Sequence, residues 1–369
     1  MVRFGLSVCK VMIIVVREVK VVLLQALLTQ SSKSMKVIRS LSKKEHYQNE
    51  KIEVYGNTPN VVLMSESGAE RTVLDAQNGF DSTILRMYHE INNQEGDGID
   101  SSFQVIGFTF TRATFSAVQI VNRRIQNNSY LPMRPKFKNC IFINNNRTQN
   151  DGGAIYIEQA EPIFENCTFE NNSTVRNGGA VAIYSNIDHT INNHATRSHF
   201  RNSIFKKNKA IPFDSYQGFV GGGAIDISEW STATIVECVF DSNRVETRNV
   251  FSSGYGGAIN ARGQFSPFIS LEDNELKIES SIIKNNIVEH NGNGYGGGIS
   301  TEKPTRIANL LISNNQLRLN NQFYYQTQGA GIHFDIQETQ YNVSGLNYKE
   351  FANMELVNST VVGNKILHQ

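Results

Sequence analysis

Two short motifs alternate along the chain, and their alternation limits the fold more than any other feature of the sequence. The first motif is an apolar residue followed three positions later by asparagine. The second is a glycine pair, or a close variant of it, followed by a small and then an aliphatic residue. The asparagines are Asn145, Asn172, Asn208, Asn243, Asn286, Asn315 and Asn364, and the aliphatic residues are Ile155, Val181, Ile225, Ile259, Ile299 and Ile332. Such interleaving is typical of a solenoid.

The spacing of the motifs indicates the kind of solenoid. The shortest period, from Ile155 to Val181, is 26 residues (181 − 155). One β-helix coil with short corners has this length, and longer periods are explained by insertions, because loops tolerate length changes and stacked strands do not. We therefore predict an all-β, right-handed, single-stranded parallel β-helix of pectate-lyase-like architecture over residues 50–369. Weaker strands are expected at 60–65, 72–75, 103–110 and 117–120.

Stacking at about 4.8 Å places equivalent residues of successive coils above one another. We expect the aliphatic residues to form one internal column and the motif phenylalanines, such as Phe142 and Phe169, to form another. Asn145 and its equivalents are expected at a turn, where asparagine tolerates left-handed backbone and hydrogen-bonds to its stacked neighbours. The glycine pair is expected at a tight corner that a Cβ would forbid.

Three of the four cysteines occupy one repeat position. Cys140, Cys167 and Cys238 each lie two residues before a motif phenylalanine. We interpret them as a stack of buried thiols that pack as small apolar groups. A Cys140–Cys167 disulfide between adjacent coils is the alternative. The sequence contains no CxxC pair, which argues against zinc-ribbon and thioredoxin-like folds.

The charge balance and the N-terminal segment bear on whether the protein binds nucleic acid or spans a membrane. The net charge is +1, from 35 basic and 34 acidic residues, and this balance argues against a nucleic-acid partner. Residues 1–49 form a separate segment that we interpret as signal-like, amphipathic or non-native. Its longest apolar run, 11–16, is interrupted by Arg17 and is too short for a membrane span, so we expect no membrane span in this chain.

The paired motifs resemble the repeat of the chlamydial polymorphic outer membrane proteins. The stretches 63–75 and 105–110 resemble the first coils of such β-helix proteins, so the resemblance covers about residues 50–369. It implies a secreted or surface-displayed, outer-membrane-associated protein that acts as an adhesin. Because Asn364 is not followed by a glycine pair, we expect the β-helix to be truncated at its C-terminus.

The β-helix fold also carries polysaccharide lyases and glycoside hydrolases, so a carbohydrate-active enzyme is an alternative. Glu158, Asp226 and Glu229 lie on the outward side of glycine-motif strands, and Arg262 follows on the coil after Asp226. Two carboxylates at a suitable separation suffice for an inverting hydrolase. We favour the alternative that Asp226 and Arg262 are solvated, outward-facing residues.

Metal and ligand sites are weakly indicated. Asp97 and Asp100 lie in an acidic glycine-containing stretch that resembles a calcium loop in composition but lacks the ligand spacing, and an ordinary turn is favoured. We expect no cofactor. Long insertions follow alternate glycine motifs, and their aromatic residues are candidates for a recognition surface. These residues are Tyr184, Phe265, Phe268, Tyr341 and Tyr348.

The sequence leaves three functions open. The preferred one is a non-catalytic adhesin or binding solenoid at the cell surface, whose partner is a glycan or a surface protein of a host or neighbouring cell. The second is a carbohydrate-active lyase or hydrolase that uses Asp226, Glu229 or Arg262. The third is a structural spacer of a larger surface protein.

Overall fold

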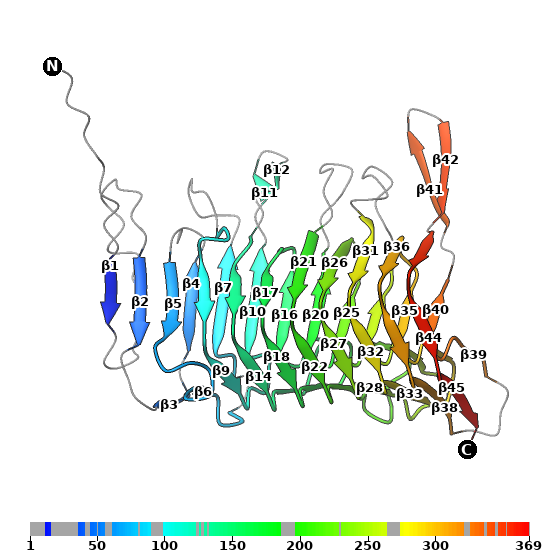
Figure 1. Ribbon diagram of the computed structural model, residues 1–369, viewed down its shortest axis with the longest axis horizontal. Helices are drawn as coiled ribbons and strands as arrows, with labels where there is room; N and C mark the ends of the chain where they lie inside the picture. Colours follow the sequence, from blue (N-terminus) through cyan, green and yellow to red (C-terminus); the bar gives the residue numbers. More distant parts are fainter. Residues whose placement is uncertain are drawn as a thin grey trace.

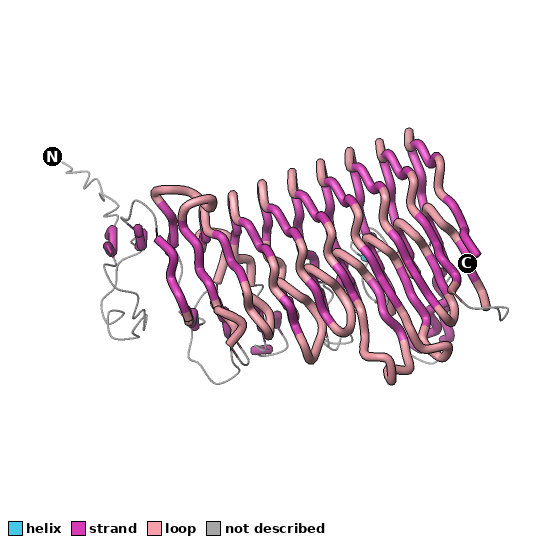
Figure 2. Tube along the Cα trace, turned by 90° about the horizontal axis from the view of Figure 1, so that it is seen from below, coloured by secondary structure: helices cyan, strands magenta, loops and turns pink. Residues whose placement is uncertain are grey.

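The chain forms a parallel β-solenoid whose coils follow one another along the long axis of the molecule (Figure 1). The computed structural model describes residues 12–15, 36–40, 45–49, 51–55, 61–79, 82–89, 99–122, 125–126, 129–130, 133–185, 196–228, 230–263, 274–320, 325–335, 338–343, 346–351 and 353–368. Seen from below, the coils are successive rungs of one stack (Figure 2). The predicted parallel β-helix is confirmed at the level of its stacked parallel sheets.

Three long parallel sheets form most of each coil. Sheet A contains β1 (Met12–Val15), β2 (Lys36–Ser40), β5 (Val61–Ser65), β8 (Gln104–Ile106), β13 (Lys136–Lys138), β17 (Ile163–Glu165), β21 (Thr196–Arg201), β26 (Ser231–Val236), β31 (Leu276–Glu279), β36 (Thr305–Ala308) and β43 (Met354–Val357). Sheet B contains β3 (Glu45–Gln48), β6 (Thr72–Asp75), β9 (Thr109–Thr111), β14 (Ile141–Ile143), β18 (Thr168–Glu170), β22 (Ile204–Lys206), β27 (Val239–Asp241), β32 (Ile282–Lys284), β37 (Leu311–Ser313) and β44 (Thr360–Val362). Sheet C contains β4 (Ile52–Tyr55), β7 (Leu85–His89), β10 (Val118–Asn122), β16 (Ile155–Glu158), β20 (Val181–Tyr184), β25 (Ile225–Ile227), β30 (Ile259–Ala261), β35 (Ile299–Thr301) and β40 (Ile332–Phe334).

Shorter strands complete the coils between sheets B and C. Sheet D contains β15 (Asn146–Arg147), β19 (Ser173–Thr174), β23 (Lys209–Ala210), β28 (Arg244–Glu246), β33 (Ile287–His290), β38 (Gln316–Leu319) and β45 (Lys365–His368). Sheet E contains β24 (Phe219–Gly221), β29 (Ser253–Tyr255), β34 (Gly294–Tyr295) and β39 (Thr327–Gln328). Two antiparallel hairpins, β11 (Ile125–Gln126) with β12 (Ser129–Tyr130) and β41 (Glu338–Val343) with β42 (Leu346–Phe351), project from the same edge of the stack (Figure 1).

The stack also includes strands that precede residue 50. Strand β1 pairs with β2, β2 pairs with β5, and β3 pairs with β6, all in parallel. The structure has no helix element among the residues it describes, and therefore none that is long and apolar enough to cross a membrane.

The interior consists of columns of like residues. The aliphatic motif residues lie in direct register along sheet C, from Ile155 through Val181 and onward to Ile332. In sheet B the rings of Phe142, Phe169 and Phe205 stack at centroid distances of 4.8 and 4.5 Å. These phenylalanines are 0% exposed. Each coil therefore buries the same kind of apolar side chain at the same position, and this burial stabilises every coil in the same way.

The motif asparagines form a second kind of column at the corner between sheets B and D. The side-chain amide of Asn172 donates to Oδ1 of Asn208 (3.0 Å) and to the carbonyl of Phe142 (2.9 Å), and equivalent bonds recur along the column. The left-handed residue of this turn is the one before the column, such as Asn144 (φ 56°) or Asn171 (φ 58°). Our expectation of left-handed backbone at Asn145 and its equivalents was therefore wrong by one position.

Glycines and cysteines occupy the remaining tight positions. Gly222, the first glycine of its motif, has φ +64°, a region that L-residues rarely adopt. A Cβ on Gly223 would lie 2.1 Å from the carbonyl oxygen of Gly257 on the next coil.

Cys140, Cys167 and Cys238 are free and buried, and their Sγ atoms contact backbone carbonyls. Burial holds the pKa of the Cys238 thiol at about 12, which keeps it neutral.

Candidate functional site

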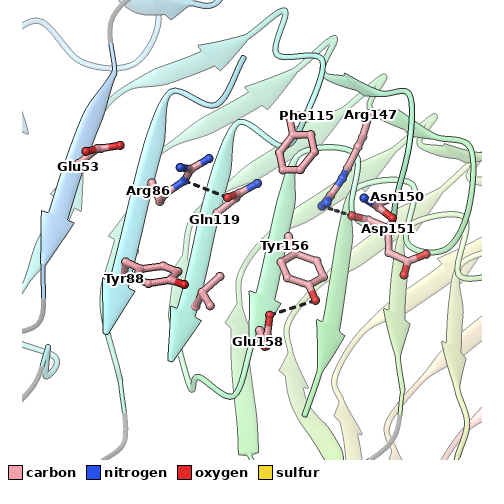
Figure 3. Close-up of a pocket in the computed structure, with 11 residues that line it drawn as sticks. Glu53, Arg86, Tyr88, Phe115, Gln119, Arg147, Asn150, Asp151, Tyr156 and Glu158 are labelled. Atoms are coloured by element: carbon pink, nitrogen blue, oxygen red, sulfur yellow. Dashed lines mark hydrogen bonds between the residues drawn. The ribbon is translucent and has the colours of Figure 1, made fainter. Parts of the chain in front are cut away.

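A hollow of about 590 Å³ lies on the outer face of sheet C, over strands β4, β7, β10 and β16 (Figure 3). The alternation of strand residues builds its floor, because every second side chain points away from the core. Glu53, Arg86, Gln119 and Tyr156 occupy one register position on these strands. A second row, two residues further on, supplies Tyr88, Val121 and Glu158 to the lining.

The wall of the hollow comes from segments before β10 and β16. Phe115 precedes β10, and Arg147, Asn150 and Asp151 lie between the asparagine corner and β16. The Arg147 guanidinium lies between two rings, with its Cζ 4.3 Å from the Phe115 centroid and 5.0 Å from the Tyr156 centroid. Figure 3 shows these side chains beside the strands of sheet C. Two cation–π contacts hold the guanidinium plane in place.

Arg147 is a buried cation with neutral partners. The residue is 3% exposed, and its Nη1 donates to Ser116 Oγ (2.9 Å) and to the Asp151 carbonyl. Its Nε is buried and finds no acceptor among the described residues. Burial lowers the pKa of Arg147 to about 10, and the nearby charge of Asp151 opposes this shift. Arg147 therefore remains protonated at neutral pH.

The floor is ordered by side-chain hydrogen bonds. Arg86 Nε donates to Gln119 Oε1 (3.2 Å) on the neighbouring strand, and the Tyr156 hydroxyl donates to Glu158 Oε2 (3.3 Å). Burial, followed by the charge of Glu158, raises the pKa of Tyr156 above its usual range. Tyr156 is thus a protonated hydroxyl at neutral pH and is unsuited to act as a general base. The pocket combines aromatic surface, amides and charged groups of both signs.

A second hollow, of about 410 Å³, runs beside the asparagine corner. Lys207, Lys209 and Arg244 contribute its positive charge. Arg244 is paired with Glu246 (2.9 Å) and Glu289 (2.8 Å), whereas neither lysine forms an ion pair within the described parts of the chain. This basic groove is a distinct surface from the sheet C pocket.

Asp226, the first catalytic candidate, does not lie at an open surface. Asp226 faces outward on sheet C but is 1% exposed, so our interpretation of it as a solvated residue was wrong. The chain at Gly221 lies directly against Asn260, the register partner of Asp226, and closes over this part of the sheet. Asn260 donates to Asp226 Oδ1 (2.7 Å), and burial raises the pKa of Asp226 to about 6.

The three other catalytic candidates are placed differently. The Arg262 guanidinium lies 5.3 Å from the Phe219 ring centroid, and its charge partly opposes the effect of burial on the pKa of Asp226. Glu229 lies outside the described residues. Glu158, by contrast, lines the sheet C pocket.

The metal candidates do not form a described site. Asp97 lies outside the described residues, and Asp100 accepts a hydrogen bond from the backbone of Ser102 (2.8 Å), as in an ordinary turn. Within the described ranges, no group of three or more histidine, cysteine, aspartate or glutamate side chains is arranged to hold a metal ion.

The aromatic candidates fall in three different settings. Tyr184 is half-buried at the end of β20 and is the register partner of Glu158, next to the pocket. Tyr341 and Tyr348 are paired across the β41–β42 hairpin. Phe265 and Phe268 lie outside the described residues.

The residues of the pocket were not singled out from the sequence, with the exception of Glu158. Arg147 follows Asn145 by two residues, and Tyr156 follows Ile155 directly, so both have fixed places in the repeat. Arg86 lies on a strand that carries neither motif. The register of sheet C would have grouped these residues, because they lie at matching positions on neighbouring strands. To use this register, one must know that β7 and β10 precede β16 in the stack.

Comparisons with known proteins identify the repeat. Residues 141–158 and 166–184 match the Chlamydia polymorphic membrane protein repeat. The first match runs from β14 to β16 and the second ends at the end of β20, so each contains the asparagine corner and the glycine turn of one coil. No curated protein and no solved structure gave a significant match. The chain is therefore a parallel β-solenoid that carries the Chlamydia polymorphic membrane protein repeat.

Proposed function

We propose that the protein is a surface-associated, non-catalytic solenoid that binds glycans in the sheet C pocket. The repeat match supports the surface association, because the family that gives the repeat its name is described as a membrane protein family of Chlamydia. On this proposal the protein is extracellular or attached to the outer membrane, and it acts as an adhesin toward a host or neighbouring cell.

The pocket is the observation that carries the proposal. Its volume of about 590 Å³ lies within the roughly 300–1,000 Å³ range of ligand pockets. Phe115, Tyr88 and Tyr156 contribute ring surface, while Gln119 and Asn150 contribute amide donors and acceptors. Sugars present apolar ring faces bordered by hydroxyl groups, so this mixture of rings and amides matches their chemistry.

The stacking of coils favours an extended ligand. Equivalent residues of adjacent coils are about 4.8 Å apart, a distance close to the length of one sugar residue in an extended chain. The floor residues Arg86, Gln119 and Tyr156 come from three successive strands of sheet C. A linear oligosaccharide that lies along the solenoid axis would therefore meet a new side chain at each sugar.

The experiment is a glycan array followed by titration calorimetry with the best-bound oligosaccharide. We expect Tyr88→Ala, which removes a half-buried ring from the lining, to weaken binding about tenfold. The matched control is Phe251→Ala, which removes a 72% exposed ring outside the pocket. Equal losses in both variants, or no glycan binding by the wild type, would reject the proposal and leave the spacer function.

A carbohydrate-active enzyme is the second candidate function. The observation in its favour is that Glu53, Asp151 and Glu158 line the same pocket. A hydrolase that uses Glu158 would release reducing ends from its bound glycan, and Glu158→Gln would abolish that release while retaining binding. Binding by the wild type without product formation would support the non-catalytic function.

A further inference from the structure

We propose that the sheet C pocket selects carboxylated sugars, and that Arg147 and Arg86 bind their carboxylate groups. This inference rests on the proposed glycan binding and adds the chemical class of the ligand. It starts from two guanidinium groups that line one pocket and form no ion pair with any described residue, although three carboxylates line the same pocket.

The setting of Arg147 is the stronger half of the argument. A buried charge that forms no ion pair is costly, and proteins normally pair or neutralise it; here the charge of Asp151 acts on Arg147 without a direct ion pair. The rings of Phe115 and Tyr156 hold the guanidinium of Arg147, so ligand atoms must approach in its plane. Only Nη1 is bonded, and its acceptors, Ser116 Oγ and the Asp151 carbonyl, are both neutral. Nε is buried and has no acceptor among the described residues, and no described residue accepts from Nη2, so Nη2 is the donor offered to a ligand.

Arg86 provides the second positive group. Its Nε is engaged by Gln119, which fixes the side chain and leaves both Nη atoms without a partner in the described structure. Strand β10 separates β7 from β16, so the Cα atoms of Arg86 and Tyr156 are about 10 Å apart. Arg147 contacts Tyr156, so the two guanidinium groups flank Gln119 along the axis. Carboxylates on sugars of one extended oligosaccharide match this arrangement.

The described hydrogen bonds of the acidic pocket residues are made with groups other than the two arginine side chains. Asp151 Oδ1 accepts hydrogen bonds from the backbone and side-chain amides of Asn177 (2.9 and 3.1 Å). Glu158 accepts from the Tyr156 hydroxyl. Glu53 is the register neighbour of Arg86. Carboxylates in these positions are suited to accept hydrogen bonds from sugar hydroxyls.

The test compares charged and neutral forms of the same glycans by titration calorimetry. One arm uses tri-galacturonate and its carboxyl-reduced form, and the other uses sialyllactose and lactose. We expect the carboxylated member of at least one pair to bind tenfold or more tightly. The arm in which this preference occurs distinguishes uronate from sialate ligands. Equal affinity for charged and neutral members in both arms would overturn the inference.

Variants locate the preference on the protein. Arg86→Gln keeps a polar group next to Gln119, and Arg147→Lys keeps the charge but loses the planar guanidinium that the two rings hold. Each is expected to reduce the preference at least fivefold, with thermal melting used to verify that the variant is folded. Lys207→Gln combined with Lys209→Gln neutralises the separate basic groove and is expected to leave the preference unchanged. A preference lost only in the lysine variant would contradict the inference.

The two proposals fail in different ways. Neutral glycan binding that depends on Tyr88 but shows no carboxylate preference would keep the proposed function and reject the acidic ligand. Absence of binding to every array member, and to all four titrated glycans, would reject both proposals.

Discussion

At the residue scale, each asparagine of the corner column satisfies all the polar atoms of its side chain. Asn208 donates to the carbonyl of Phe169 (2.9 Å) and to Asn243 Oδ1 (2.9 Å). Its Oδ1 accepts from the backbone N–H and the side-chain amide of Asn172, both at 3.0 Å. The side chain is 0% exposed, so no water replaces a lost partner. The amide group thus connects three successive coils.

This arrangement predicts a large effect of a small substitution. Asn208→Ala would remove the acceptor of the Asn172 backbone N–H and one of the two acceptors of its side-chain amide, and it would remove the amide donor to the Phe169 carbonyl. We expect a loss of unfolding free energy on the order of 3 kcal/mol, because each orphaned buried group costs about 1–3 kcal/mol and the losses are not additive. The measurement is urea denaturation, with Lys209→Ala as control. A loss equal to that of the control would contradict the role of the column.

The sequence identified the column but could not place the strained residue within it. Asparagine pairs such as Asn144-Asn145 and Asn171-Asn172 offer two candidates for each turn. Both amides suit a turn chemically, and only the backbone angles reveal that the first is left-handed. The same limit applies to Asp226, because alternation predicts that it faces outward but cannot show that another segment covers it.

At the element scale, the glycine turn sets the distance between coils at the corner before sheet C. The N–H of Gly223 donates to the carbonyl of Gly256 (3.2 Å), and the N–H of Ala224 donates to the carbonyl of Ala258 (2.9 Å). A side chain on the second glycine would occupy the space of the neighbouring backbone. The turn therefore requires glycine for close approach as well as for its backbone angles.

Two glycine substitutions separate these requirements. Gly223→Ala would place its Cβ 2.1 Å from the Gly257 carbonyl oxygen and 2.6 Å from the Arg244 nitrogen. We expect destabilisation of more than about 4 kcal/mol, because backbone atoms of adjacent coils cannot move apart singly. Gly68→Ala meets no atom within 4 Å and has φ +78°, so we expect a loss of about 1 kcal/mol. Thermal melting that ranks them in the opposite order would contradict this account.

The register of the coils could be predicted from the sequence only where both motifs recur. From β14 onward the motifs give the register, and the structure places Ile155 and Val181 as direct partners. Before β14 the strand at Gln119 was expected, but β7 was not, because Leu85–His89 carries no motif. The pocket spans this boundary, so its floor could not be assembled from the sequence.

At the scale of the whole molecule, the solenoid combines a repeated interior with an outer surface that varies from coil to coil. The inward motif residues of sheet C remain aliphatic from β16 to β40. The outward residues at one register position change from glutamate and arginine to glutamine and tyrosine over β4 to β16. The interior needs uniform columns for stability, and the outer face has no such requirement. Recognition can therefore vary from coil to coil without altering the fold.

Hydroxyl-radical footprinting with and without the best-bound oligosaccharide tests the central claim most directly, namely that the outer face of sheet C over β7 to β16 is the binding surface. The prediction is that bound glycan lowers oxidation of Tyr88 and Phe115, which line the pocket. Oxidation of Phe219 and Phe251, which are 53% and 72% exposed outside it, should remain unchanged. Protection of Phe219 or Phe251 with unchanged Tyr88 and Phe115 would contradict the account.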